Sequence, residues 1–172
     1  MNLKSHIREF PGFPEPGILF KDISPILKNP KAMNYVLDQF HEHYKNERVD
    51  IIAGMELRGL IFAAALAAKF DKGLFMIRKQ NKLPGPTIKK GYDIEYGNAI
   101  MEVQKDALEP GQHVLVVDDL LATGGTAHAA AELIEKLGGH VAGFSFVIEL
   151  LQLKGRKKIN NFNIQTLVNY NA

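Results

Sequence analysis

The chain has 172 residues, 46% of them hydrophobic, and its 21 Lys and Arg against 19 Asp and Glu residues leave a formal net charge of +2. This length is typical of one globular domain, and a charge so near zero argues against binding nucleic acid or a membrane through bulk electrostatics. The sequence has no cysteine, which excludes disulfides and thiolate sites, and it has no apolar signal core or span-length apolar run, so we expect a cytoplasmic protein.

Predicted helices and strands alternate along most of the chain. Apolar residues at helical spacing after Asn29-Pro30 predict an amphipathic helix to about residue 46. Further strands are predicted at 49–54, 73–79, 113–120 and 140–150, and further helices at 58–70 and 126–137. The apolar run of the third strand implies cover on both faces, as in a parallel sheet. The alternation predicts an α/β fold with an open, mostly parallel central sheet flanked by helices.

Two segments rich in Pro and Gly do not fit the alternation, residues 10–24 and residues 82–97. Both are too long for simple connections between neighbouring elements. Long loops in a compact domain are usually functional, so we expect both to serve the site.

The segment VLVVDDLLATGGTA joins the third predicted strand to a helix through a glycine pair. In open α/β folds the ligand crevice lies beyond the carboxyl ends of the strands, where this segment falls. Its backbone N–H groups could surround a phosphate at the positive end of the helix, with two threonine hydroxyls as further donors. The residues concerned are Ala122, Thr123, Gly124, Gly125 and Thr126. Neither a Walker lysine nor the dinucleotide glycine spacing is present.

Two carboxylates, Asp118 and Asp119, precede this loop. They would repel a phosphate at contact distance, so they must face sugar hydroxyls, a cation, or both, on the same ligand. A phosphorylated sugar offers such a combination. The alternative is a helix start that merely favours acidic residues before it. A receiver domain also carries an acidic pair at a strand end, but too few residues follow Asp119 to complete that fold.

These residues resemble the phosphoribosyl-pyrophosphate motif of the type I phosphoribosyltransferases. The segments FPEPGILFKDISPIL, IAGMELRGLIFAAALA, IRKQNKLPGPT, IEYG, QKDALEPG and ELLQLKGR extend the resemblance, over nearly the full chain, to the adenine phosphoribosyltransferase family. The resemblance implies that adenine and Mg²⁺–phosphoribosyl pyrophosphate give AMP and pyrophosphate. It also implies one domain over residues 1–172, with a small N-terminal hood that binds the base at about 1–28 and a flexible catalytic lid loop at about 80–97.

The resemblance assigns further roles to the charged residues. Arg58 stands at a second junction between a strand and a helix, where its guanidinium could hold pyrophosphate, although Leu57 replaces a commonly smaller residue. Asp118 and Asp119 would hold Mg²⁺ indirectly, through water or sugar hydroxyls. Arg78 and Lys82, which we expect on an edge strand, would reach the pyrophosphate of a neighbouring subunit and so imply a homodimer.

The base has its own candidate residues. The backbone of Leu19 and Lys21 could read the edge of adenine, and by resemblance Phe20 and Leu150 would sandwich its ring. Ala122 stands where relatives that use 6-oxopurines typically carry an aspartate, and alanine cannot transfer a proton. By resemblance Glu95 would therefore handle the proton on the imidazole ring of the purine, while Tyr96 would cover the sugar.

Two other functions stay open. The sugar-phosphate motif is common to the superfamily, so the chain could transfer phosphoribose to another base such as xanthine. A regulator that senses phosphoribosyl pyrophosphate without catalysis is the second alternative. It would be expected to carry a DNA-binding extension or an eroded lid.

Overall fold

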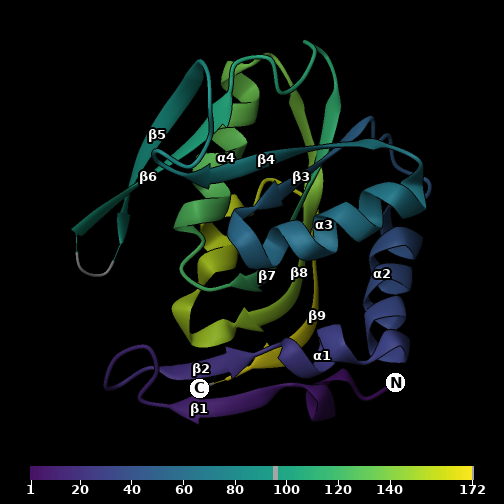
Figure 1. The fold of residues 1–172 in the computed structure, drawn as a ribbon, viewed down its shortest axis with the longest axis vertical. Helices are drawn as coiled ribbons and strands as arrows, with labels where there is room; N and C mark the ends of the chain where they lie inside the picture. The colour runs from purple at the N-terminus through teal and green to yellow at the C-terminus, as the bar shows by residue number, and fades with distance from the viewer. Residues whose placement is uncertain (95–96, 172) are drawn as a thin grey trace.

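The computed structural model describes residues 1–94 and 97–171, and a seven-stranded sheet forms its centre (Figure 1). The strand order is β5-β6-β4-β3-β7-β8-β9. Strands β3, β4, β7, β8 and β9 are parallel, while β6 pairs antiparallel with both β4 and β5. The strands are β3 (Ile51–Met55), β4 (Gly73–Lys79), β5 (Thr87–Ile94), β6 (Gly97–Gln104), β7 (His113–Leu121), β8 (His140–Leu150) and β9 (Ile164–Tyr170).

Helices cover both faces of this sheet (Figure 1). Helices α2 (Pro30–Tyr44) and α3 (Glu56–Phe70) lie on one face, and α4 (Gly125–Lys136) lies on the other. Strand β7 supplies both cores, because Leu115 and Val117 point to the first face and Val114 and Val116 to the second. The predicted α/β fold is therefore confirmed.

Local sequence explains where α2 begins. Pro30 occupies its first position, where no hydrogen-bonded N–H is required, and the Asn29 side chain accepts bonds from the N–H groups of Lys31 and Ala32. The helix ends at Tyr44, slightly before the predicted end. The buried Tyr44 hydroxyl donates to the carbonyl oxygen of Phe144 at 2.8 Å, which ties the end of α2 to β8.

A separate two-stranded hairpin precedes α1 (Ser24–Lys28) and consists of β1 (Arg8–Pro11) and β2 (Leu19–Asp22). It lies beside the end of β9 (Figure 1), where Lys21 Nζ is 3.9 Å from the ring centroid of Tyr170. Short 3-10 turns lie at Leu3–His6, Leu151–Leu153 and Gly155–Ile159. No helix in the described part of the chain is both long and apolar enough to cross a membrane.

The two segments expected to be loops contain strands. Residues 10–24 include most of the β1–β2 hairpin, and residues 82–97 include all of β5. Strands β5 and β6 extend the sheet beyond β4, so β4 lies between β3 and β6. The prediction that β4 is an edge strand is therefore wrong. The expected lid residues Glu95 and Tyr96 lie outside the described residues.

Candidate active site

The loop between β7 and α4 makes an unusually close backbone approach to a distant turn. Gly124 has a φ of +78°, and a Cβ there would overlap the carbonyl oxygen of Gly155. A Cβ on Gly155 would in turn overlap the carbonyl oxygen of Ala122. Both positions therefore require glycine, one for conformation and space and the other for space alone. Gly155 was not among the predicted site residues, and its only signal in the sequence was its place in the motif ELLQLKGR.

An ion pair between the partly exposed Arg156 and the buried Glu149 holds the turn that carries Gly155. Arg156 donates from Nε and Nη2 to the two carboxylate oxygens of Glu149, at 3.1 and 2.7 Å. The Glu149 side chain is 4% exposed, and Thr166 Oγ1 also donates to it at 3.0 Å. A two-pronged charge-assisted contact of this kind fixes geometry as well as adding stability. Strands β8 and β9 thereby hold the turn against the glycine loop.

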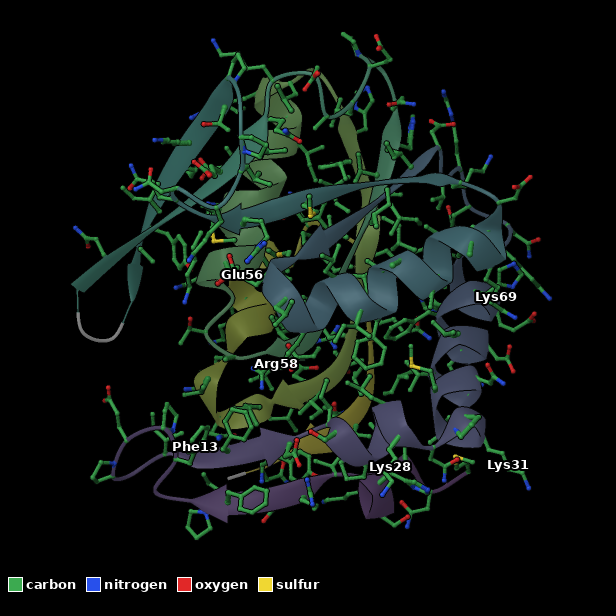
Figure 2. The ribbon with its side chains drawn as sticks, in the orientation of Figure 1. Phe13, Lys28, Lys31, Glu56, Arg58 and Lys69 are labelled. Carbon is green, nitrogen blue, oxygen red and sulfur yellow. The ribbon has the colours of Figure 1, made fainter. Side chains whose placement is uncertain are left out.

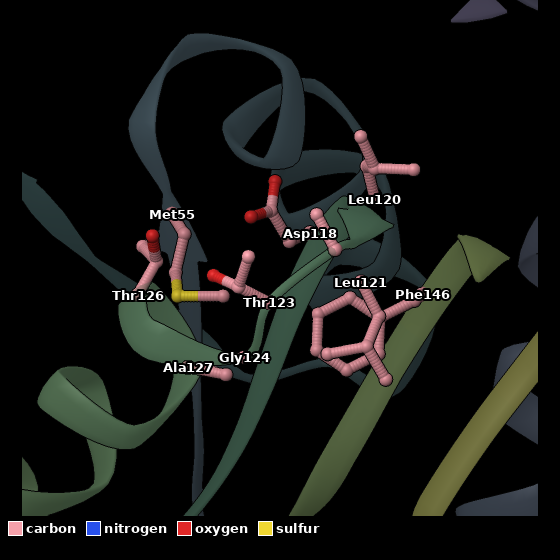
Figure 3. A pocket seen from close by; sticks show the side chains of 10 residues that line it. Met55, Asp118, Leu120, Leu121, Thr123, Gly124, Thr126, Ala127 and Phe146 are labelled. Carbon is pink, nitrogen blue, oxygen red and sulfur yellow. The ribbon is translucent and has the colours of Figure 1, made fainter. Parts of the chain in front are cut away.

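A cavity of about 60 Å³ lies between the loop and the ends of β3, β7 and β8. Figure 3 shows the side chains of Asp118, Thr123 and Thr126 around this space, together with Met55. Backbone amides at the start of α4 and two threonine hydroxyls suit a small anion such as a phosphate group. The remaining lining residues are Leu120, Leu121, Ala122, Gly124, Ala127 and Phe146.

The two carboxylates lie in different surroundings. Asp118 lines the cavity and is partly exposed there, yet the surrounding protein desolvates it and raises its pKa well above the usual value, and the charge of Asp119 raises it further. Gly59 allows this approach, since a Cβ at Gly59 would lie 2.6 Å from Asp118 Oδ1. Burial also raises the pKa of Asp119, although Arg58 opposes this shift. Hydroxyl donors or a cation would compensate the cost of holding both charges here.

Arg58 connects the carboxylates to the N-terminal hairpin. Its Nε lies 3.0 Å from Asp119 Oδ2, and its guanidinium carbon lies 5.0 Å from the ring centroid of Phe20. The Arg58 side chain is 39% exposed, so it remains accessible to a ligand. Figure 2 shows Arg58 on the side of α3 that faces the hairpin. The sequence analysis expected Arg58 at this junction but not its contacts with Asp119 and Phe20.

The junction between β3 and α3 has an uncommon backbone. Glu56 has a φ of +49°, a left-handed conformation that costs energy for a residue other than glycine. Its carboxylate accepts a bond from the backbone N–H of Lys79 and lies 3.8 Å from Arg78 Nε. Leu57 is 64% exposed. Glu56 thus links this junction to the end of β4.

The basic residues Arg78, near the end of β4, and Lys82, in the turn after it, differ in orientation. Arg78 faces Glu56 of its own chain, which follows from the interior position of β4 and corrects the expected edge placement. Lys82 is exposed, and its backbone N–H donates to Glu102 at 3.0 Å, as does that of Leu83. Burial alone would raise the pKa of Glu102. The backbone N–H groups that donate to its carboxylate have the larger combined effect, so the pKa lies below its usual value. Glu102, missed by the sequence analysis, therefore positions the turn that carries Lys82.

The hairpin offers an apolar ring to a flat ligand. Phe20 is partly exposed and contacts Phe13 edge to face, with ring centroids 5.0 Å apart. Both rings line a hollow of about 450 Å³. The side chain of Lys21 points elsewhere, to Glu9 at 2.5 Å, which leaves only its backbone for the predicted role. Leu19 is exposed, and Leu150 is partly buried at the end of β8.

The described residues contain no group of three or more His, Cys, Asp or Glu side chains arranged to hold a metal ion. The available carboxylates are Asp118, which lines the cavity, and its buried neighbour Asp119. One or two carboxylates completed by substrate oxygens are typical of Mg²⁺ sites, so this set fits that ion.

Comparisons with known proteins agree on one family. The profile of the phosphoribosyl transferase domain matches residues 22–171. The adenine phosphoribosyltransferase of Nitrosopumilus maritimus is 54% identical over 170 residues, which cover 99% of this chain and 100% of that protein. The crystal structure of adenine phosphoribosyltransferase from Thermoanaerobacter pseudethanolicus superposes with a TM-score of 0.95 at 45% identity, covering 98% of both chains. The structure of the Saccharomyces cerevisiae enzyme, complexed with an imino-altritol bisphosphate and adenine, superposes with a TM-score of 0.90 at 41% identity, covering 96% of both chains.

Proposed function

Because the chain belongs to the phosphoribosyltransferase family, we infer that it transfers phosphoribose from phosphoribosyl pyrophosphate to adenine, forming AMP and pyrophosphate in purine salvage. The observation that carries this conclusion is full-length identity of up to 54% to proteins named for adenine. The anion cavity beside two carboxylates supports it, since one phosphorylated sugar would use both features.

The loop of residues 122–126 would bind the 5′-phosphate. Its amides lie at the start of α4, and Gly155 holds the backbone in place by close contact. Asp118 and Asp119 would accept hydrogen bonds from the ribose hydroxyls. These contacts fix the sugar so that its anomeric carbon is presented to the base.

Magnesium would be held at Asp118 and Asp119 through water or sugar hydroxyls. When bound, the ion neutralises part of the pyrophosphate charge and so eases its departure. Arg58, Arg78 and Lys82 would supply positive charge at the same end of the ligand. Glu56 would keep Arg78 near the pyrophosphate through their contact. Glu102 would keep Lys82 there by holding the turn that carries it.

Adenine would bind between the sheet and the hairpin. Phe20 and Leu150 would pack on the faces of the ring, and the backbone of Leu19 and Lys21 would bond to its edge. We propose that Glu95 handles the proton of the imidazole ring and that Tyr96 covers the sugar. The partly exposed rings of Phe20 and Phe13 support a flat apolar ligand at this place.

The function is tested by incubating the chain with phosphoribosyl pyrophosphate, Mg²⁺ and each natural purine, and identifying the nucleotide formed. We expect AMP with adenine and far slower reaction with hypoxanthine, guanine or xanthine, because Ala122 offers no acid to a 6-oxopurine. Comparable turnover of one of the other purines would contradict adenine selectivity.

We also propose a homodimer. Leu57 and Ile61 are 64% and 39% exposed on α3, next to a hollow lined by Leu60, Ala64 and Leu74. Exposed apolar area of this kind marks an interface, and the exposed Lys82 could reach a partner's site. Light scattering on wild type at micromolar concentration should give twice the chain mass, and Leu57→Asp should give a monomer. A monomeric wild type would contradict this assembly.

A further inference from the structure

One face of β5 is docked along α4. Ile88 and Tyr92 pack against the second core, which includes Ala127 and Ala131 of α4. Lys90, which lies two residues from each of them along the strand, donates to Glu132 of α4 at 3.0 Å. The three residues therefore share one face, as the period of a strand requires.

The contact nearest the start of α4 joins two hydroxyl groups. Tyr92 Oη lies 3.0 Å from Thr126 Oγ1, and Thr126 lines the cavity of the glycine loop. A threonine hydroxyl has one proton to donate and two lone pairs that accept. If the tyrosine donates to it, the threonine proton is free for another acceptor, and the cavity is where an anion would provide one.

We propose that Tyr92 is a positioning residue for the 5′-phosphate of the sugar. Its hydroxyl donates to Thr126 and so orients the threonine proton toward the phosphate. The inference rests on the proposed function, because it needs a phosphate in this cavity. Strand β5, in a segment expected to be a loop, would thereby take part in substrate binding.

A purely structural role for Tyr92 would predict a different outcome. Tyr92→Phe keeps the ring against α4 and removes only the hydroxyl. Lys90→Met is the matched control, since it breaks a second polar contact between β5 and α4 without touching Thr126. If docking alone matters, both variants should behave alike.

Binding of ribose 5-phosphate, which carries the phosphate and sugar but neither base nor pyrophosphate, should be measured by calorimetry. We expect Tyr92→Phe to raise the Kd for ribose 5-phosphate and the KM for phosphoribosyl pyrophosphate by about two- to tenfold, the effect of one hydrogen bond. The KM for adenine should stay within about twofold, and Lys90→Met should bind ribose 5-phosphate as wild type does.

A double-mutant cycle with Thr126→Val then tests the route of the effect. On that background Tyr92→Phe should add no further loss. The proposal is overturned if Tyr92→Phe binds ribose 5-phosphate as wild type does, if its loss is additive to that of Thr126→Val, or if Lys90→Met is equally impaired. Failure of wild type to form AMP while these binding effects hold would count against the proposed function alone.

Discussion

Replacing Asp118 and Asp119 together by asparagine should nearly abolish turnover and weaken binding of phosphoribosyl pyrophosphate. A hydrogen bond to a charged group contributes roughly 1.5–3 kcal/mol, so losing two should lower kcat/KM by about two to four orders of magnitude. Steady-state kinetics with phosphoribosyl pyrophosphate as the varied substrate measures this loss.

The single variants separate binding from folding. Asp118→Asn removes a desolvated carboxylate whose pKa the charge of Asp119 raises further, so it should not lower the melting temperature, whereas Asp119→Asn leaves Arg58 without its carboxylate partner. Asp71→Asn, at the exposed end of α3, is the matched control and should be fully active. Wild-type affinity for phosphoribosyl pyrophosphate in the double variant would show that the pair does not hold the sugar.

Glu95→Gln should lower kcat while leaving the affinity for phosphoribosyl pyrophosphate nearly intact. Glutamine keeps the shape of the side chain and removes its proton chemistry, and positioned acid–base catalysis contributes on the order of 10²–10⁴ in rate. Ala122 cannot transfer a proton, so another group must. Single-turnover formation of AMP is the appropriate measurement, because product release can otherwise limit kcat.

Glu95→Ala is a poorer test, since it also changes the shape of the segment. If Glu95→Gln forms AMP at the wild-type rate in a single turnover, the proton travels through solvent or another residue. In that case Glu95 is a polar residue without a catalytic role.

The elements predicted with correct type are those whose apolar residues repeat with a clear period. Strands 73–79 and 140–150 have the bounds expected, because each contains an apolar run with buried residues in its middle. Strand β5 escaped prediction because TIKKGYDI is polar, contains glycine and lies at the edge, where only one neighbour is needed. Strand β6, which pairs directly with β4, was not predicted either, and without it β4 looked like an edge strand. The edge placement expected for Arg78 was wrong for the same reason.

The candidate site divides along similar lines. The glycine loop and its two aspartates are contiguous in sequence, so their chemistry could be inferred from spacing alone. Gly155 and Glu102 act through contacts with residues distant in the chain, the first with Ala122 and the second with the turn at Lys82. Such contacts depend on how β8 and β6 pair, and no local pattern encodes that pairing.

The most direct test of the central claim is a crystal structure of the chain with AMP, which carries phosphate, sugar and base in one molecule. The phosphate should accept bonds from the amides of residues 123–126 and from Thr126 Oγ1, the ribose hydroxyls should donate to Asp118 and Asp119, and adenine should pack on Phe20. A phosphate bound away from the 122–126 loop, or an adenine that does not contact the N-terminal hairpin, would contradict the account.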